Sequence, residues 1–301
     1  MTKQITYRNR KTDEMISEPL ILPRVQYAVA QSRVAIFVYN IFLNTYSFCW
    51  LLGKWMDLSG SRKKIQAFVQ KYDINLDEIE LPLEQYENLN AFFSRKLKPD
   101  ARPFIADPHI FCSPADGKVL AYPKLDAQTR LPVKGSHVDI AHLLSSKESA
   151  IPYRNGAALV IRLAPADYHR YHFPVAGIAT SSAEISGRYY LVNPIALDVK
   201  PDLFAHNKRE ITYLETEHFG RIMIMEVAGW GVGRIVQTYQ PGTIKRGQEK
   251  GYFQFGGSTL VLLFEPGRII FDNDLIRDTQ ADIEVQVLAG SQLGVQAISK
   301  N

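Results

Sequence analysis

The sequence predicts an α+β fold, with N-terminal helices followed by a mostly antiparallel β core that is either barrel-like or sandwich-like. Helical periodicity is found in the first hundred residues, and beyond them the apolar segments are short, rich in β-branched residues and bounded by glycine. Helical patterns do not alternate with these segments, which disfavours a βαβ layer. A stretch with prolines at 99, 103, 108 and 114 separates the two patterns. We therefore expect a helical region at 1–100 and a β-rich region at 101–301.

The composition is that of an ordinary globular protein, since 46% of the 301 residues are hydrophobic and 22% are charged. Two cysteines, Cys49 and Cys112, exclude a disulfide framework and a site of four thiolates. The net charge of +4 fits an anionic lipid or a phosphorylated ligand, although many soluble enzymes share it. The N-terminal residues MTKQITYRNRKTDEM carry charge where a signal peptide needs an apolar core, so no signal peptide is expected.

The first predicted helix is Val34 to Leu52, an uncharged segment whose length could just span a bilayer. Its polar residues and flanking charges nevertheless form one helical stripe, and its large apolar residues lie opposite. This pattern favours a helix lying in a membrane interface over one crossing it. A helix packed on the rest of the protein is an equal alternative. The stripe consists of Arg33, Asn40, Asn44, Ser47 and Lys54, and the opposite face of Ile36, Phe37, Ile41, Phe42, Phe48 and Leu52.

The remaining elements follow in chain order. Arg62 to Tyr72 and Leu89 to Leu97 are predicted helices, because each has charge on one side and apolar residues on the other. The predicted strands are AALVIRL, GRIMIMEV, GRIVQTY, STLVLLF and RIIF. In PGTIKRGQEKGYFQF, tight hairpins are expected, with turns at Gly242, Gly247 and Gly251.

Two stretches combine reactive side chains with an irregular backbone. In CSPADGKV, Asp116 precedes a glycine, which taken alone indicates an ordinary turn. RLAPADYHRYHFPVAG places Asp167, His169 and His172 close together, and on a helix these could hold a metal. Pro165 and Pro174 bracket the stretch and favour a loop or a short extended segment instead.

The third stretch, FQFGGSTLVLLFEPG, places two glycines before a serine at the start of a predicted core strand. A serine becomes a nucleophile when a base takes its proton and a third group orients the base. Ser258, His172 and Asp116 are of the right types. Because Gly257 lacks a side chain, Ser258 could reach back to the carbonyl of Gly257, which indicates self-processing and not attack on an outside substrate.

Five stretches together, in this order, give the chain a resemblance to the phosphatidylserine decarboxylases, pyruvoyl-dependent enzymes of phosphatidylethanolamine synthesis. They are NLNAFFSRKLKPDARP, SPADGKV, RLAPADYHRYHFPVAG, LFAHNKREI and KGYFQFGGSTLVLLFEPG. The resemblance runs from about Tyr86 to the C-terminus. The N-terminal helices are similar in kind to the membrane-associating start of such enzymes.

The resemblance implies a role for each candidate residue. His172, oriented by Asp116, takes the proton of Ser258, whose oxygen attacks the Gly257 carbonyl. The resulting ester breaks by β-elimination between Gly257 and Ser258. The products are a large chain, 1–257, and a small chain, 258–301, held together as a heterodimer that could assemble further. The former Ser258 becomes a covalent pyruvoyl group, the cofactor that forms a Schiff base with phosphatidylserine. His169 assists decarboxylation by protonating the α-carbon.

The resemblance also implies where the protein works and what it binds. We expect a peripheral enzyme on the cytoplasmic face of the cell membrane, with no metal and no nucleic-acid partner. Candidate phosphate partners are Lys118, Lys134, Lys208 and Arg209. Many family members have Leu where this chain has Gly256, which could change the rate of processing.

Three alternatives remain. The first is a metal-dependent hydrolase using Asp167, His169 and His172. The second is a β module of the kind that carries biotin or lipoate, although that needs a lysine at the turn where this chain has Gly257 and Ser258. The third is the same chemistry on a related serine phospholipid.

Overall fold

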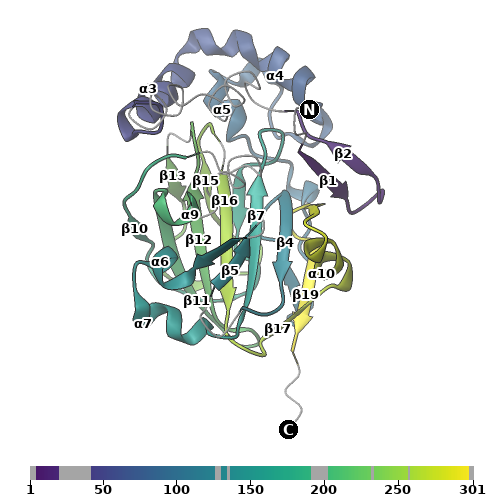
Figure 1. The fold of residues 1–301 in the computed structure, drawn as a ribbon. Coiled ribbons are helices and arrows are strands. Elements are labelled where there is room, and N and C mark those ends of the chain that lie inside the picture. The colour runs from purple at the N-terminus through teal and green to yellow at the C-terminus, as the bar shows by residue number, and fades with distance from the viewer. Residues whose placement is uncertain are drawn as a thin grey trace.

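The computed structural model describes residues 5–19, 42–125, 130–133, 136–190, 203–231, 234–256 and 258–297. One large sheet runs through the molecule, and a layer of helices lies across one end of it (Figure 1). The helices are α3 Tyr46–Asp57, α4 Ile65–Tyr72, α5 Leu89–Phe93, α6 Ile140–Leu144, α7 Lys147–Ala150, α9 Leu203–His206 and α10 Asn273–Gln280.

The large sheet has eleven strands and is antiparallel except where β1 runs parallel to β18. Along the sheet its strands are β14 Gly242–Ile244, β9 Gly177–Ala179, β11 Arg209–Thr216, β12 Gly220–Ala228, β16 Ser258–Phe264, β7 Ala157–Leu163, β4 Gly117–Tyr122, β18 Glu284–Val287, β1 Thr6–Asn9 and β2 Met15–Ser17, and β10 Ala183–Ile185 pairs with β11.

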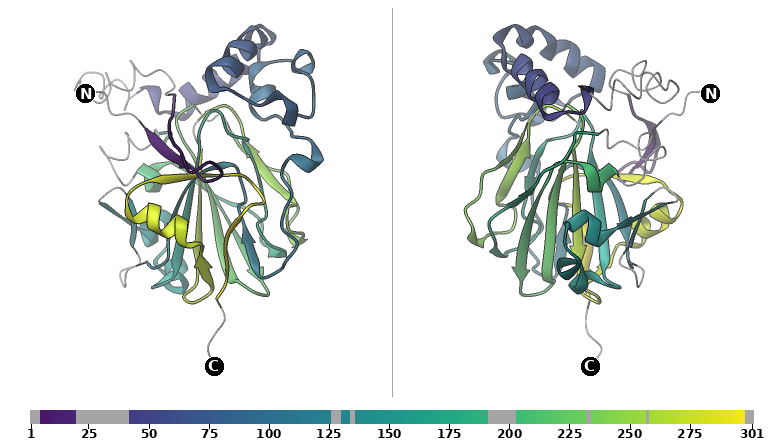
Figure 2. Two further views of the ribbon diagram at one scale, coloured as in Figure 1. Left: turned by 90° about the vertical axis from the view of Figure 1, so that its right-hand side faces the viewer. Right: turned by 60° about the vertical axis from the view of Figure 1, so that its left-hand side comes forward.

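Three smaller sheets complete the β structure. They are β13 Ile235–Gln237 with β15 Glu249–Phe253 and β8 Arg170–His172, then β17 Ile269–Phe271 with β19 Gln292–Gln296 and β3 Ile110–Cys112, and finally β5 Arg130–Val133 with β6 Ser136–Asp139. In the described part of the chain no ladder joins β14 to β2, so the large sheet is not closed, and of the two expected arrangements the barrel is wrong. The two three-stranded sheets pack against one face of the large sheet, which makes the core sandwich-like (Figure 2).

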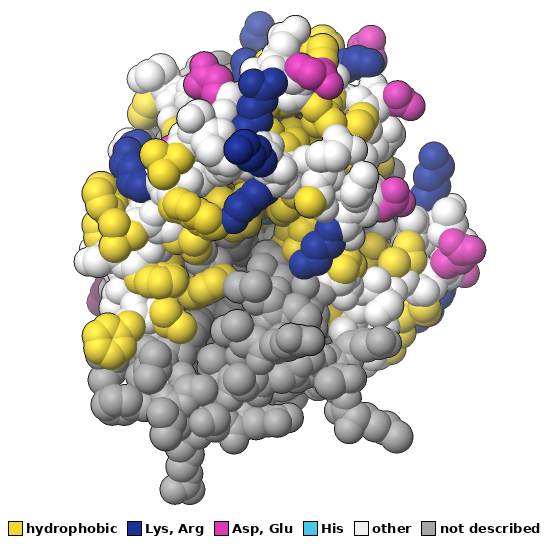
Figure 3. Space-filling view, turned by 90° about the horizontal axis from the view of Figure 1, so that it is seen from above, with side chains coloured by type: hydrophobic (Ala, Val, Ile, Leu, Met, Phe, Trp, Pro, Cys, Tyr) yellow, Lys and Arg dark blue, Asp and Glu magenta, His cyan; other side chains and the backbone are white. Residues whose placement is uncertain are grey.

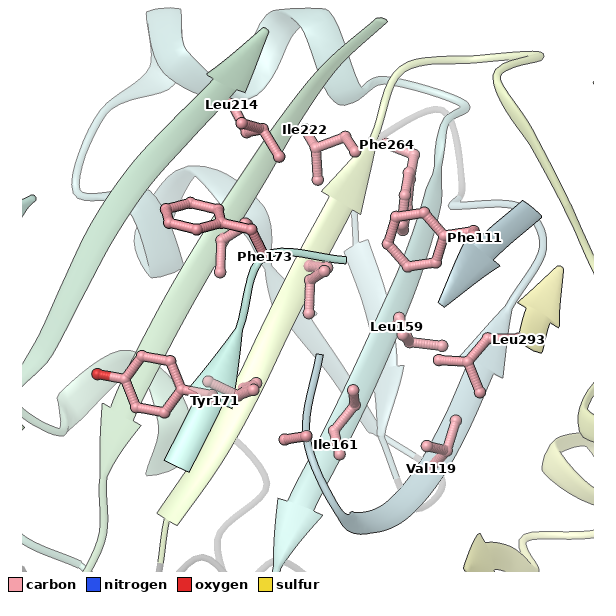
Figure 4. Close-up of a cluster of buried hydrophobic side chains, with 14 of the residues drawn as sticks. Phe111, Val119, Leu159, Ile161, Tyr171, Phe173, Leu214, Ile222, Phe264 and Leu293 are labelled. Carbon is pink, nitrogen blue, oxygen red and sulfur yellow. The ribbon is translucent and has the colours of Figure 1, made fainter. Parts of the chain in front are cut away.

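The strand alternation explains why the large sheet has a core on each face. In β16, Leu260, Leu262 and Phe264 point to one side and Val261 and Leu263 to the other. The first side packs against the small sheets, as Figure 4 shows for Phe111, Tyr171, Phe173 and Phe264. The second side is covered by residues of α6, α7 and α9. Because both faces are covered, β7 and β16 are apolar along most of their length.

The helices are not confined to the N-terminus, which corrects the prediction. α6, α7, α9 and α10 occur within the β region, and β1 and β2, near the start of the chain, belong to the large sheet. Short helices such as α6 have too few periods to be recognised from an apolar pattern. The predicted helix Leu89 to Leu97 ends earlier, as α5, because Leu97 instead pairs with Ile79 in an isolated β-bridge.

The helix predicted at Val34 to Leu52 differs from the structure in start and orientation. Residues 34–41 lie outside the described residues, and α3 begins at Tyr46, capped by Thr45, whose hydroxyl accepts the Phe48 N–H at 3.3 Å. Asn44, expected in a polar stripe, is fully buried. Ser47 and Lys54 of that stripe are exposed, as expected, but so are the large apolar residues Phe42, Tyr46, Trp50, Leu51, Trp55 and Leu58. No helix of the described residues is long and apolar enough to cross a membrane.

The predicted hairpins at PGTIKRGQEKGYFQF are also corrected. β14 and β15 belong to different sheets, because β14 pairs with β9 whereas β15 pairs with β13 and β8. Gly242 and Gly247 have positive φ, at 121° and 72°, as turn glycines do. Gly251 lies within β15, where a Cβ would meet the Val236 carbonyl oxygen at 2.2 Å, so its role is close packing.

Candidate active site

Ser258 is the first residue of β16, at the end of the sheet that lies under the helical layer. It pairs with Leu163 of β7 on one side and Ala228 of β12 on the other. Ser258 is fully buried, and its Oγ has no hydrogen-bond partner among the described residues. A buried hydroxyl without a partner is costly in a folded protein and is typical of a reactive site.

The turn before Ser258 is held by α5. The side-chain oxygen of Asn90 accepts the Phe255 N–H at 2.9 Å, and its amide donates to the Asp57 carboxylate at 2.8 Å. The Phe93 ring lies 5.0 Å from the Phe255 ring. Gly256 has a φ of 142°, a conformation that side-chain-bearing residues rarely adopt, and Gly257 lies outside the described residues. Glycine at 256, where the resemblance led us to expect leucine, therefore fits its backbone.

His169 is fully buried close to this turn, since the Phe93 ring contacts both His169 and Phe255. Its ring centroid is 3.9 Å from that of Phe93, and its Nδ1 donates to the Asp167 carbonyl oxygen at 2.9 Å. Nε2 has no partner among the described residues and carries the free lone pair. Burial lowers the pKa of His169 to about 3, so the imidazole is neutral at neutral pH.

His172 ends β8, the short extended segment that the bracketing prolines predict. Its ring lies between those of Phe104 and Tyr168, at centroid distances of 5.7 Å and 5.9 Å. Nδ1 is buried and has no partner in the described part of the chain. Burial lowers the pKa of His172, which keeps its ring available as a base.

Asp116 precedes β4 and is 4% exposed. Its carboxylate accepts from the Arg102 guanidinium at 2.8 Å and 2.7 Å and from the Ala289 N–H at 2.8 Å. Burial raises the pKa of Asp116, and Arg102 opposes that shift. The backbone N–H of His172 donates to the Pro114 carbonyl at 2.8 Å, so β8 adjoins the segment that carries Asp116. Among these described side chains, however, no hydrogen bond joins Asp116 to His172.

Asp167 does not combine with the histidines as a metal site. Its carboxylate is buried and forms an ion pair with Lys118 at 2.8 Å, and it also accepts the Ala164 N–H at 2.6 Å. No group of three metal-ligating side chains occurs within the described ranges. The metal-hydrolase alternative therefore has no cluster there to support it.

The other cations predicted as candidate phosphate partners have partners within the protein where the structure describes them. Lys208 pairs with Glu184 at 2.9 Å, and Arg209 is buried, donating to the Leu143 and Asn207 carbonyls. Lys134 lies outside the described residues. Neither Arg95 nor Arg102 was predicted as a site residue, although both lie in NLNAFFSRKLKPDARP. For Arg95 the available signal was a charge two residues after the apolar pair Phe92 and Phe93.

Comparison with known proteins matches residues 89–295 to the family model for phosphatidylserine decarboxylase. Three similar proteins are each named phosphatidylserine decarboxylase proenzyme. The one from Clostridium novyi (strain NT) is 42% identical over 89% of this chain and 91% of its own. That from Clostridium tetani is 38% identical over 98% and 100% of the two chains, and that from Chlamydia muridarum 39% over 97% and 98%. With a family match over most of its length and relatives this similar along almost all of it, the chain belongs to the phosphatidylserine decarboxylase family.

Proposed function

We propose that this protein decarboxylates phosphatidylserine to phosphatidylethanolamine in phospholipid biosynthesis, using a pyruvoyl group made from its own Ser258. The observation that carries the proposal is the buried, unpartnered Oγ of Ser258, directly after two glycines, in a chain of this family. The word proenzyme in the relatives' names agrees with self-processing. The orphaned nitrogens of His169 and His172 fit a site built to move protons.

Self-cleavage uses groups of this chain alone. His172 takes the Ser258 proton, and Oγ attacks the Gly257 carbonyl carbon, so the peptide bond is replaced by an ester and an amine. Removal of the Ser258 α-proton then expels the Gly257 carboxylate and leaves dehydroalanine. The dehydroalanine tautomerises to an imine, and water hydrolyses this imine to ammonia and the pyruvoyl group at the start of 258–301. We assign to Asp116 the orientation of His172, since the backbone N–H of His172 joins its strand to Pro114, two residues before Asp116.

The two products stay associated because cleavage falls at the end of a strand. β16 pairs along its whole length with β7 and with β12, both of which remain in the large chain, 1–257. Most of its side chains are buried between the two core layers. The heterodimer is therefore held by the sheet and not by the bond that breaks.

The pyruvoyl group supplies a ketone that takes up the substrate amine and accepts electrons as CO₂ leaves. Our assignment to His169 follows from its protonation state. Because its Nδ1–H is committed to the Asp167 carbonyl, Nε2 is the ring nitrogen that can take up the proton released as the substrate amine attacks the ketone. The same nitrogen can return that proton to the α-carbon after decarboxylation, so one neutral histidine balances both steps.

The helical layer offers a surface for a membrane. Figure 3 shows hydrophobic side chains with Lys and Arg among them on the face above the sheet. The apolar residues are those of the α3 segment, and Lys54, Arg62, Lys63 and Lys64 are exposed beside them. Aromatic and basic residues together suit the interface of an anionic bilayer. We propose peripheral attachment through this face, on the cytoplasmic side.

The test is an intact-mass measurement of the purified protein under denaturing conditions. The expected result is two species divided between Gly257 and Ser258, the smaller one blocked to N-terminal sequencing. Ser258→Ala should remain one chain and lack decarboxylase activity, because it has no hydroxyl for the attack. An active, full-length Ser258→Ala protein would refute the pyruvoyl mechanism.

A further inference from the structure

Arg95 holds a buried positive charge with which no carboxylate of the described residues forms an ion pair. The residue is 4% exposed. Its Nη2 donates to the Ala166 carbonyl at 3.1 Å and approaches that of Asp167 at 3.5 Å, while Nε and Nη1 have no partner in the described part of the chain. Leaving two donors of a buried cation unsatisfied is costly, which indicates that something else binds them.

Arg95 lines a cavity of about 400 Å³ beside the proposed active site. Four carboxylates lie in its wall. Glu78 and Asp116 pair with Arg102, Asp167 pairs with Lys118, and Asp73 forms no ion pair with Arg95 in the described part of the chain. Burial lowers the pKa of Arg95 and Asp116 opposes that shift, but a guanidinium stays protonated in proteins. A small anion is therefore the ligand that these donors suit.

Resting on the function proposed above, we propose that Arg95 binds the phosphodiester of the phospholipid head group. The Nη2 of Arg95 and the Nδ1 of His169 both approach the carbonyl oxygen of Asp167, at 3.5 Å and 2.9 Å, so the guanidinium that would hold the anion and the proton-transfer imidazole share one peptide group. In phosphatidylserine, one oxygen and one carbon join the phosphorus to the amine-bearing carbon, which keeps the reacting groups near His169. Ser258 is not part of the cavity wall in the uncut chain.

The head group has a second anion, its carboxylate, but the reaction argues against that partner. The carboxylate loses its charge as it becomes CO₂, so a guanidinium bound to it would stabilise the substrate more than the transition state. The phosphodiester keeps its charge throughout. Binding it positions the substrate without opposing decarboxylation.

The test measures binding separately from turnover, on the self-cleaved protein, with two probes that cannot condense with a ketone. Glycerophosphocholine carries the phosphodiester and glycine betaine carries a carboxylate, and neither has a primary amine. Arg95→Gln should raise the Kd of glycerophosphocholine about 10- to 100-fold, the usual effect of losing a charge-assisted hydrogen bond, and leave betaine unchanged. Arg221→Gln, at the far end of β12, is the matched control and should change neither.

An unchanged Kd for glycerophosphocholine in Arg95→Gln overturns the proposal, and so does a loss confined to betaine, which would assign Arg95 to the carboxylate. If Arg95→Gln does not self-cleave, Arg95→Lys keeps the charge but loses Nε and the planar fork, and weaker phosphodiester binding is again required. Wild-type protein that does not self-cleave contradicts the proposed function itself, whereas a cleaved, active protein with unaltered Arg95→Gln binding contradicts only the phosphodiester site.

Discussion

Replacing Asn90 with alanine should slow self-cleavage without impairing the processed enzyme. Asn90 is buried and makes two hydrogen bonds, one from the Phe255 N–H and one to Asp57. Removing its side chain leaves the Phe255 N–H unsatisfied, which costs about 1–2 kcal/mol, and this amide lies two residues before the cleaved carbonyl. If that energy holds the turn in its reactive conformation, the cleavage rate constant should fall by roughly 5- to 30-fold.

Asn88→Ala is the matched control. Asn88 caps the same helix, accepting the Ala91 N–H at 2.8 Å, and also donates to Asp57, but it does not contact Phe255. Losing the cap destabilises α5 by about 1 kcal/mol, so a general loosening of the helix is reproduced. The assay is the fraction of uncut chain against time, by intact mass. Wild-type cleavage in Asn90→Ala, or equal slowing in Asn88→Ala, would refute the reasoning.

Three further predictions concern the histidines and the core. His169→Ala should still self-cleave but lose most turnover, measured as CO₂ release per cleaved chain; blocked cleavage would mean that the two histidine roles are exchanged. Because the pKa of His169 is about 3 when folded and 6.5 when unfolded, the unfolded chain binds more protons between these values. In uncut Ser258→Ala, His169 should therefore lower the free energy of unfolding by about 2 kcal/mol between pH 7.5 and pH 5. This contribution should be absent when His169→Gln is added. An equal loss with His169→Gln would contradict the low pKa assigned to folded His169. Lys250 and Glu226 form a fully buried ion pair at 2.8 Å, and the Gln237 side chain hydrogen-bonds to both. Lys250→Met should cost about 3–5 kcal/mol in denaturant unfolding, because it leaves the Glu226 charge buried and unpaired, and adding Glu226→Leu should recover much of that cost; no recovery would refute this explanation.

The strands of the core could be predicted from the sequence because burial on both faces leaves a direct signature. AALVIRL and STLVLLF coincide with β7 and β16 at both ends. The pairing could not be predicted in the same way. β14 and β15 look like one hairpin because glycines separate them, yet each has its partners elsewhere in the chain, and register between distant strands leaves no local trace.

In the candidate site, too, the sequence indicates which residues take part but not which side chains contact one another. Ser258 and His169 are predicted site residues on motif and resemblance, and both are buried with an unpartnered polar atom. That Asp116 would be held by Arg102 was not predictable, because Asp116 lies fourteen positions after Arg102, across a proline-rich segment. Proline-rich segments carry no periodicity from which to infer what their side chains meet.

The position of Ser258 connects the proposed membrane surface to the proposed chemistry. α3, which exposes its aromatic residues, ends at Asp57; Asp57 binds Asn90, and Asn90 binds the turn that precedes Ser258. Three hydrogen-bonded residues thus join the surface proposed to contact lipid to the bond proposed to break. A phospholipid keeps its acyl chains in the bilayer while its head group reacts, so the reactive strand end has to lie directly beneath the docking surface. With Ser258 at the opposite end of β16, the head group would have to travel the length of the sheet, and no arrangement of side chains could compensate for that distance.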